Sequence, residues 1–340
     1  MKGDPTLTAP RALGQPDATA LVRVSPADFK VEEITAVRPA GTGEHLLVRV
    51  RKRGANTQWV ARSLASRAGV RIRDIGFAGL KDRHAVTEQW FSIHLPGRDV
   101  SLETLAGGDY EILERVRHSR KIRRGALRGN RFEIILREVD GDRRLLAERL
   151  ERLRSRGAPN YFGSQRFGKD GSNLALTGTQ RRLPSIRLSA YRSFLFNAML
   201  SRRVEDGTWE RVLPGDCLLL DGTQRYFSVD AVDEALVERA RHLDIHPTGA
   251  MWGRGEPASG LAVADMERNI AAEWLGFSAV LESRGLRQDR RALRMRVRDL
   301  DWRWVDSSSL VLMFTLPRGS YATALLRELV LLRSARLSQP

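Results

Sequence analysis

Apolar and polar residues alternate along several short segments of the chain, which predicts β-strands. The clearest case is residues 89–95, where Phe91, Ile93 and Leu95 mark one face of a half-buried strand. Similar runs predict strands at residues 20–24, 30–34, 44–50, 75–80, 132–138 and 309–316. A turn is expected at residues 25–28, before the second of these strands. The beginning and the end of the chain are therefore rich in predicted strands.

Four segments have the periodicity or the end residues of helices. Asn56 can cap a helix that runs to about residue 67, with Gly69 placed to end it. Trp59, Val60 and Leu64 would form its buried stripe. Further helices are expected at residues 142–156, 189–204 and 322–332. The pattern changes at residues 157–160, so we place a domain boundary there, before a helix-rich middle.

The stretch from residue 76 to residue 90 is the first candidate for chemistry. Asp82 follows a buried apolar run and stands between Lys81 and Arg83, on a connection between two predicted strands. In a partly desolvated site, adjacent cations keep a carboxylate ionised, and an ionised carboxylate only accepts hydrogen bonds. We interpret Asp82 as the catalytic residue. On this stretch alone, a solvated aspartate in a turn is the alternative.

Composition adds a strong positive charge to this picture. The 340 residues include 57 Lys and Arg against 41 Asp and Glu, a formal net charge of +16, which attracts polyanions. Nucleic acid is the first candidate and an acidic membrane surface the second. No apolar stretch has the length of a membrane span and no signal peptide is recognisable, so we expect a cytoplasmic protein. Cys217 is the only cysteine, which excludes an intrachain disulfide and a cysteine cluster for zinc.

Positive charge is concentrated in residues 115–131, which contain no acidic residue. Such a run is either a solvated face or a contact for a phosphate backbone, and the basic chain favours phosphate. Two residues apart on an extended segment, Asn130 and Phe132 project from one face and together suit a nucleobase. An asparagine that braces a turn is the alternative. Eight cations make up the run: Arg115, Arg117, Arg120, Lys121, Arg123, Arg124, Arg128 and Arg131.

Two other patterns imitate known sites. Residues 163–169 have the glycine spacing and the lysine of a phosphate-binding P-loop, but Asp170 stands where a hydroxyl should hold magnesium. His242 and His246 have the one-turn spacing of metal ligands. Pro247 would end a helix there and no third ligand is evident, so we expect turn or capping roles.

Several long motifs resemble one enzyme family. Residues 76–90 read GFAGLKDRHAVTEQW, which is similar to the signature of the TruD family of tRNA pseudouridine synthases. Seven further regions resemble this family in the same order and over nearly the whole chain: residues 28–33, 43–45, 56–57, 124–132, 159–168, 192–197 and 316–323.

The resemblance implies an α+β fold: a pseudouridine-synthase-like catalytic domain with a mixed, mostly antiparallel sheet, interrupted by an inserted α/β TRUD domain. We accordingly expect an irregular leader at residues 1–19 and the first part of the catalytic domain at 20–156. The inserted TRUD domain would span residues 157–300, and the last part of the catalytic domain residues 301–340.

The resemblance also implies the reaction and its site. An isomerase of this family converts uridine to pseudouridine in tRNA, usually uridine 13 of the D arm, without a cofactor or metal. Asp82 would be the catalytic carboxylate, and Phe29, Asn130, Phe132 and Tyr321 would contact the base. From its position alone, Phe29 is by default a core aromatic.

Two departures from the family pattern concern the site. Tyr321 stands where phenylalanine is common, so its hydroxyl needs a partner if it is buried. Arg23 stands where lysine is common, and we expect it to pair with Asp82. The expected partner is tRNA, bound by a monomer. The alternative from another functional class is a non-catalytic RNA-binding or RNA-folding module.

Overall fold

The computed structural model describes residue 6, residues 8–176 and residues 183–334. Of the expected leader, residues 1–5 and 7 lie outside the described residues, as do residues 335–340 at the other end. Within the described residues, contacts divide the chain into two compact units. Unit 1 holds the N-terminal residues up to Asp17, Asp142–Val297 and Ser320–Val330, and unit 2 holds Ala18–Gly141, Arg298–Gly319 and the residues from Leu331 onward.

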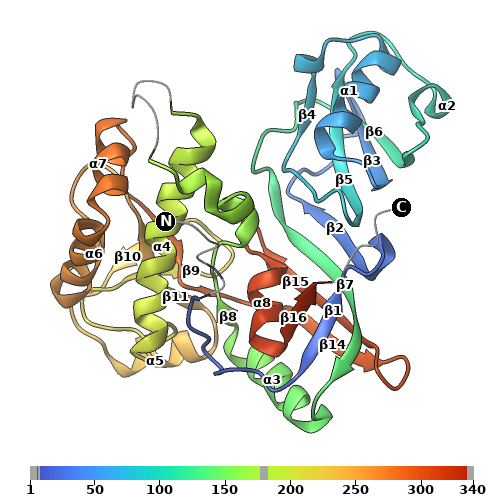
Figure 1. Cartoon of the computed structure of the whole chain (residues 1–340). Helices are drawn as coiled ribbons and strands as arrows, with labels where there is room; N and C mark the ends of the chain where they lie inside the picture. Colours follow the sequence, from blue (N-terminus) through green and yellow to red (C-terminus); the bar gives the residue numbers. More distant parts are fainter. Residues whose placement is uncertain (1–5, 7, 177–182, 335–340) are drawn as a thin grey trace. The chain divides into compact units, whose positions relative to one another are not determined.

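Unit 2 is built on a ten-stranded sheet (Figure 1). The main order is β14-β15-β7-β2-β5-β3-β6, while β1 pairs with β7 and β16, and β4 pairs with β5. The pairs β2/β5 and β1/β16 are parallel and the other pairs are antiparallel. This mixed, mostly antiparallel sheet confirms the predicted α+β class. Its strands are β1 (Thr19–Val22), β2 (Phe29–Thr35), β3 (His45–Arg53), β4 (Ile75–Phe77), β5 (Val86–His94), β6 (Tyr110–His118), β7 (Leu127–Asp140), β14 (Arg298–Trp304), β15 (Leu310–Pro317) and β16 (Leu331–Ser334).

Helix α1 (Thr57–Ala68) packs on this sheet and is the helix predicted from its end residues. The side chain of Asn56 accepts a hydrogen bond from the backbone N–H of Trp59 at 2.8 Å, and Gly69 ends the helix with φ of 62°. Val60 and Leu64 are fully buried in the same cluster as residues of β3 and β5. Trp59 was wrongly placed in the buried stripe, because 40% of it is exposed. The remaining short helices of unit 2 are α2 (Leu102–Leu105), η1 (Pro26–Asp28) and η2 (Ile72–Asp74).

The end of the chain differs from the predicted helix at residues 322–332. Helix α8 (Ala322–Leu329) stops at Leu329, and the next residues form strand β16, which pairs in parallel with β1. The apolar run that crosses this point suits a helix or a buried strand equally well. Pairing with a strand more than three hundred residues earlier decides between them, with Thr19 opposite Leu331.

Unit 1 combines helices with a four-stranded sheet of order β10-β9-β11-β12, in which all pairs are antiparallel. Helix α4 contacts β11, α6 and α7, so it lies at the centre of this unit (Figure 1). The helices are α3 (Arg143–Arg156), α4 (Ser185–Glu205), α5 (Glu234–Arg241), α6 (Leu261–Glu273), α7 (Leu275–Ser283) and α8, with η3 (Ser164–Arg166) and η4 (Lys169–Leu174). The strands are β8 (Ala158–Pro159), β9 (Cys217–Leu220), β10 (Tyr226–Ser228), β11 (Ile245–Met251), β12 (Asp289–Ala292) and β13 (Arg294–Met295).

Helices α3 and α8 contact each other and belong to unit 1. The boundary expected at residue 157 therefore falls inside this unit, after α3. These units are defined by contacts alone, so the division into a catalytic domain and an inserted TRUD domain stays a proposal.

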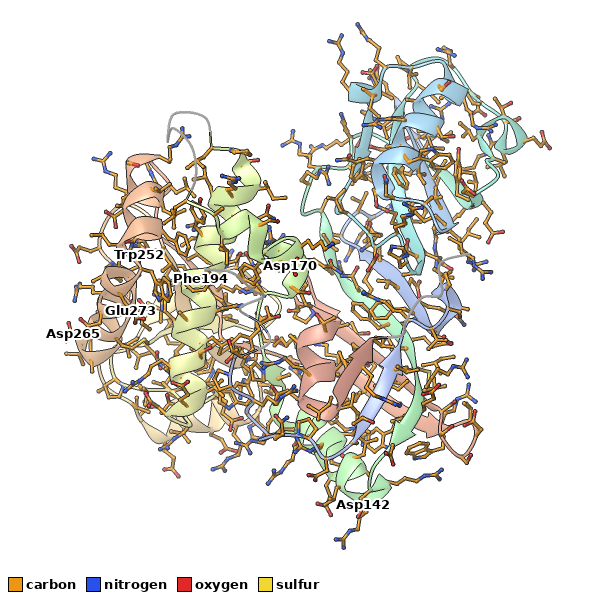
Figure 2. All side chains as sticks on the ribbon, in the orientation of Figure 1. Asp142, Asp170, Phe194, Trp252, Asp265 and Glu273 are labelled. Carbon is orange, nitrogen blue, oxygen red and sulfur yellow. The ribbon has the colours of Figure 1, made fainter. Side chains whose placement is uncertain are left out.

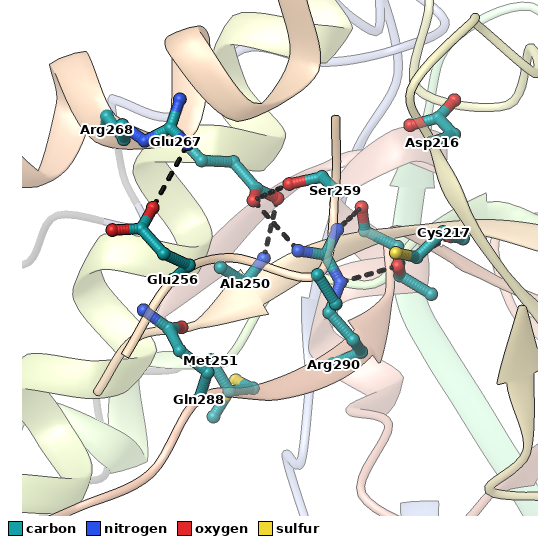
Figure 3. Close-up of polar contacts among 12 residues, drawn as sticks. Asp216, Cys217, Ala250, Met251, Glu256, Ser259, Glu267, Arg268, Gln288 and Arg290 are labelled. Atoms are coloured by element: carbon teal, nitrogen blue, oxygen red, sulfur yellow. Dashed lines mark hydrogen bonds and ion pairs between the residues drawn. The ribbon is translucent and has the colours of Figure 1, made fainter. Parts of the chain in front are cut away.

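The core of unit 1 contains an aromatic cluster and a buried ion pair. Phe194 on α4, labelled in Figure 2, packs edge-on against Trp274 and Phe277, with ring centroids 4.7 and 5.3 Å away. Glu267 on α6 and Arg290 on β12 form an ion pair of 2.8 Å, with side chains 0% and 1% exposed. Figure 3 shows further polar contacts of this pair: Glu267 accepts from the hydroxyl of Ser259 and the backbone N–H of Ala250, and Arg290 donates to the hydroxyl and carbonyl of Thr248. The pair therefore ties α6 to β11 and β12.

Candidate active site

Asp82 lies in the loop between β4 and β5, and its carboxylate contacts a guanidinium and a backbone N–H. Arg23 Nη2 is 2.9 Å from Asp82 Oδ2, and the backbone N–H of His84 donates to Oδ1 at 2.9 Å. The Asp82 side chain is 20% exposed. The ion pair that we expected between Arg23 and Asp82 is present, and it leaves the carboxylate partly open to solvent.

Side chains of α1 and β5 hold the loop that carries Asp82. The hydroxyl of Thr57, at the start of α1, accepts from the backbone N–H of Lys81 at 2.9 Å. That hydroxyl also donates to Gln89 Oε1 at 2.7 Å, and Gln89 Nε2 donates to the carbonyl of Gly79 at 3.2 Å. The loop is thus attached to both α1 and β5 through side chains.

Lys52 also contacts this loop and is a residue that sequence reasoning missed. Its side chain is 1% exposed, and Nζ donates to the carbonyl oxygens of Asp82 at 2.9 Å and Ala55 at 2.7 Å. Burial lowers the pKa of Lys52 to about 8, with Lys81 acting in the same direction and Asp82 opposing it. On β3, Val48, Val50 and Lys52 are all buried. A lysine on the apolar face of a strand was the available signal.

Arg23 has an unusual backbone and a second contact. It follows β1 with φ of 59°, in the left-handed region that is uncommon for a non-glycine residue. Its guanidinium carbon lies 4.3 Å from the centroid of the Phe29 ring. A planar guanidinium can stack on an aromatic ring and pair with a carboxylate at once, which a lysine ammonium does less well. This geometry explains how arginine can serve at position 23, where lysine is common in the family.

Lys81 and Arg83, the cations next to Asp82 in sequence, make their described contacts elsewhere. Lys81 Nζ lies 3.4 Å from Glu33 Oε2 and donates a hydrogen bond to Asn130 Oδ1. Arg83 Nε donates to the carbonyl of Gly54 at 3.2 Å. The cations in contact with Asp82 are instead Arg23 and, through the backbone, Lys52. Chain neighbours were a poor guide here, because adjacent side chains of an extended loop diverge.

Glu33 and Lys81 form a buried pair beneath the loop, with side chains 1% and 6% exposed. Burial raises the pKa of Glu33 and lowers the pKa of Lys81, and each opposite charge works against the shift of the other. Glu33 lies directly opposite Asn130 in the β2/β7 register. Sequence reasoning missed Glu33, although Phe29, Val31 and Glu33 alternate along β2 and place Glu33 on its buried face.

Three aromatic rings share the sheet face of Asn130. Phe132 stacks on Phe314 of β15 with centroids 5.2 Å apart and meets Phe29 edge-on at 6.2 Å. Phe29 is 3% and Phe132 6% exposed, so both rings pack in the core as well as bordering Asn130. Five of the six candidate residues, Arg23 and Asp82 included, thus belong to unit 2.

Tyr321, the sixth candidate, belongs to unit 1. Arg166 Nη2 donates to the Tyr321 hydroxyl at 3.2 Å, and the Tyr321 ring meets that of Phe162 edge-on with centroids 6.0 Å apart. The hydroxyl that distinguishes tyrosine from phenylalanine therefore has a partner.

The basic segment separates into two groups. Arg115 and Arg117 pair with Asp99 and Arg131 pairs with Glu32, while Arg124 lies 4.0 Å above the Phe77 ring and Lys121 donates to a backbone carbonyl. Arg120, Arg123 and Arg128 are exposed, and no ion pair of theirs is found among the described residues. These three are the candidates for phosphate contacts.

The two imitating patterns have structural explanations. Residues 169–174 form the 3-10 helix η4, whereas a P-loop would be followed by an α-helix, so the P-loop alternative is wrong. His242 caps the end of α5 as expected, whereas His246 lies on β11, so the turn or capping role expected for His246 is wrong. Arg294 Nε donates to His246 Nδ1, and the other ring nitrogen lies 3.1 Å from Asp221, while burial lowers the pKa of His246. Within residue 6 and residues 8–176 and 183–334, no group of three or more His, Cys, Asp or Glu could hold a metal ion.

Membrane insertion has no support in the helices. In the part of the chain that the structure describes, no helix has both the length and the apolar character to cross a bilayer.

Comparisons with known proteins agree on one family. The chain matches the family model described as tRNA pseudouridine synthase D (TruD) over residues 10–179 and 170–329. It is 47% identical over 332 residues to the tRNA pseudouridine synthase D of Methylococcus capsulatus, and the match covers 94% of each chain. Identity to that of Nitrosococcus oceani is 45% over 338 residues, covering 96% of this chain and 94% of the relative. A crystal structure from Methanosarcina mazei, described as tRNA pseudouridine synthase D, has a TM-score of 0.69 at 20% identity, covering 94% of this chain and 95% of that one, which shows a shared fold.

Proposed function

The chain belongs to the TruD family of tRNA pseudouridine synthases, and we propose that it isomerises uridine 13 in the D arm of tRNA with Asp82 as the catalytic carboxylate. Conversion of uridine to pseudouridine in tRNA follows from family membership. The position in tRNA and the roles of individual residues are the proposal.

The reaction breaks the bond between N1 of uracil and the sugar, turns the free ring, and joins C5 to the same sugar carbon. No atom is oxidised and no group is added. A carboxylate can serve as nucleophile or proton acceptor, and the detached ring must be held while water is kept away.

The observation that carries the proposal is the setting of Asp82. Its carboxylate is held by Arg23 and by the backbone of His84, yet it remains partly exposed. A fixed, accessible carboxylate suits a group that meets the substrate directly. Asn130 and Phe132 supply an amide and a flat ring on one sheet face, and we propose that they contact the uracil.

Arg23, Phe29 and Tyr321 complete the proposed substrate contacts. Arg23 joins Phe29 to Asp82 through stacking and an ion pair, which supports a place for both beside the base. Tyr321 is proposed from the family motif alone. We further propose that the enzyme is a cytoplasmic monomer that needs no metal or other cofactor, and that dialysis against EDTA leaves turnover unchanged.

The direct test is tritium release from tRNA labelled at C5 of uridine. Asp82→Asn should lose at least about three orders of magnitude in rate while still binding tRNA, because the carboxylate enters the chemistry. Asp265→Asn is the matched control, since Asp265 lies exposed on α6 (Figure 2). Substantial turnover by Asp82→Asn would refute the assignment.

The same assay tests which uridine of the tRNA is modified and whether the protein is an enzyme or a non-catalytic RNA-binding module. A tRNA in which uridine 13 is replaced by cytidine should release no tritium above background, and mapping of the modified base should find position 13. Release from the altered tRNA would mean another target. Binding without any release would favour the non-catalytic RNA-binding module.

A further inference from the structure

We propose that Glu33 and Lys81 are positioning residues that fix the side-chain amide of Asn130, so that its Nδ2 donates a hydrogen bond to a carbonyl oxygen of the uracil ring. This inference rests on the proposed function and adds which group of the uracil ring Asn130 binds. In this account Asn130 recognises a carbonyl and does not accept a hydrogen bond from N3–H.

The orientation of the amide follows from the chemistry of its neighbour. The Lys81 ammonium carries three donors and no acceptor, and it bonds to Asn130. Only the oxygen of an amide can accept that bond. Turning the Asn130 amide over would place its NH2 group against an ammonium, so Oδ1 faces Lys81 and Nδ2 faces away.

Glu33 keeps this ammonium in place and charged. Its carboxylate is 3.4 Å from Lys81 Nζ, and its other oxygen accepts from the backbone N–H of Trp90 at 3.5 Å. Because Glu33 and Asn130 face each other across β2 and β7, the three side chains form one short row. The row is anchored in the sheet at both ends.

The other end of the amide is available. Among the described residues, Asn130 Nδ2 makes no hydrogen bond, and Asn130 is only half-buried. Phe132 projects from the same face two residues further along β7. Asn130 Nδ2 is therefore a donor, beside the Phe132 ring, that a bound base can contact.

A donor at this place fits the isomerisation itself. Uracil has two carbonyl acceptors, O2 and O4, placed symmetrically about the axis from N3 to C6. Turning the detached ring by half a turn about that axis exchanges N1 with C5 and O2 with O4. A fixed Nδ2 donor therefore finds a carbonyl oxygen at the same place before and after the turn.

The charges around Lys81 make the row sensitive to pH. The charged groups that act with Lys81 are Glu33 on β2, at 3.4 Å, and Lys52 on β3, while the neighbouring Asp82 is paired with Arg23. Burial lowers the pKa of Lys81 and Glu33 raises it. Without the charge of Glu33, Lys81 should lose its proton at a lower pH, and a neutral amine no longer requires Oδ1.

The first experiment uses base analogues with the full-length enzyme. Asn130→Asp keeps an oxygen for Lys81 but presents a second oxygen instead of a donor, so its turnover per folded molecule should fall markedly. Single-turnover rates are measured for wild type and Asn130→Ala on tRNA carrying 2-thiouridine, 4-thiouridine or N3-methyluridine at the target. A thiocarbonyl accepts hydrogen bonds weakly, so thio substitution should slow the wild type roughly two- to tenfold more than Asn130→Ala. N3-methylation should slow both enzymes equally.

Normal turnover by Asn130→Asp, or a coupling of Asn130 to N3-methylation alone, would overturn the inference. The melting temperature of each variant separates a loss of fold from a loss of the contact. If the wild type makes no pseudouridine at all, the proposed function fails. If it does and these couplings are absent, only the present inference fails.

The second experiment follows the pH dependence of the rate. Glu33→Gln should move the alkaline fall of the single-turnover rate downward by about 1–3 pH units, because an opposite charge has been removed. Lys81→Arg, which is again a donor without an acceptor, should retain more activity than Lys81→Met. An unchanged profile in Glu33→Gln, with equal rates for the two Lys81 variants, would mean that the row is merely structural.

Discussion

Replacing Lys52 by methionine tests whether the buried Lys52 ammonium is needed to hold the loop that carries Asp82. Methionine keeps the length of the side chain and removes the ammonium. The carbonyls of Ala55 and Asp82 then lose their donor. The change should lower turnover, because the backbone that carries the carboxylate is no longer held.

The effect on stability combines two opposing terms. In the folded protein the pKa of Lys52 is about 8 against an ordinary 10.5, a difference worth about 3 kcal/mol against the charged form. Methionine removes that penalty but leaves two carbonyls without their donor, at roughly 1–3 kcal/mol each. At neutral pH we therefore expect only a modest change in the free energy of unfolding.

The dependence on pH isolates the charge. Because the folded pKa of Lys52 lies below the unfolded one, the unfolded chain binds more protons between pH 8 and pH 10.5. Stability of the wild type therefore rises with pH in that window, by up to about 3 kcal/mol, and the penalty is fully present only below pH 8. Lys52→Met lacks this gain.

Urea unfolding of both proteins at several pH values across this window measures the difference. Lys30→Met is the matched control, because Lys30 lies exposed on β2. A difference between wild type and Lys52→Met that stays flat with pH would refute the reasoning. Turnover by Lys52→Met equal to that of the wild type would show that the loop does not depend on this ammonium.

Three further outcomes are expected. Phe132→Ala should cost about 3–5 kcal/mol of stability, because its ring stacks in the core. It should also slow single turnover per folded molecule roughly five- to 150-fold, and a normal rate per folded molecule would exclude contact with the base. Replacing Arg120, Arg123 and Arg128 by alanine should flatten the salt dependence of tRNA binding by about 0.7–0.9 log units per lost contact, whereas an unchanged slope would mark a solvated face. Glu267→Gln should lower stability in thermal unfolding by about 3–5 kcal/mol, because it leaves the buried Arg290 without its ion-pair partner. Turnover per folded molecule should stay near normal, and a stability loss below about 1 kcal/mol would contradict the reasoning.

Short-range patterns predicted most of the elements. The alternation in residues 89–95 coincides with the second half of β5, which ends at His94, and the end residues Asn56 and Gly69 bracket α1 as expected. Such features depend on neighbours in sequence, which is why they can be read directly. The ion pair of Arg23 with Asp82 was also anticipated, although its stacking on Phe29 was not.

Long-range contacts explain what was missed. Strand β16 exists because it pairs with β1, and no local pattern distinguishes it from the end of α8. Lys52 and Glu33 both occupy inward positions of alternating strands, but which groups each one contacts near the Asp82 loop depends on the fold. Family motifs lead to the residues that we propose to meet the substrate, while the groups that contact those residues are found from geometry.

The pairing of β7 with β15 has a consequence for how the protein is made. One side of β7 pairs with β1 and β2, which precede it in the chain, and its other side pairs with β15, near the end of the described chain. During synthesis on the ribosome, β7 is complete long before β15 emerges, so that other side lacks its partner while unit 1 is being translated. An unpaired strand edge invites association with other chains. The sheet that carries the Asp82 loop is thus among the last parts of the molecule to close, and slow translation would prolong its exposure to aggregation.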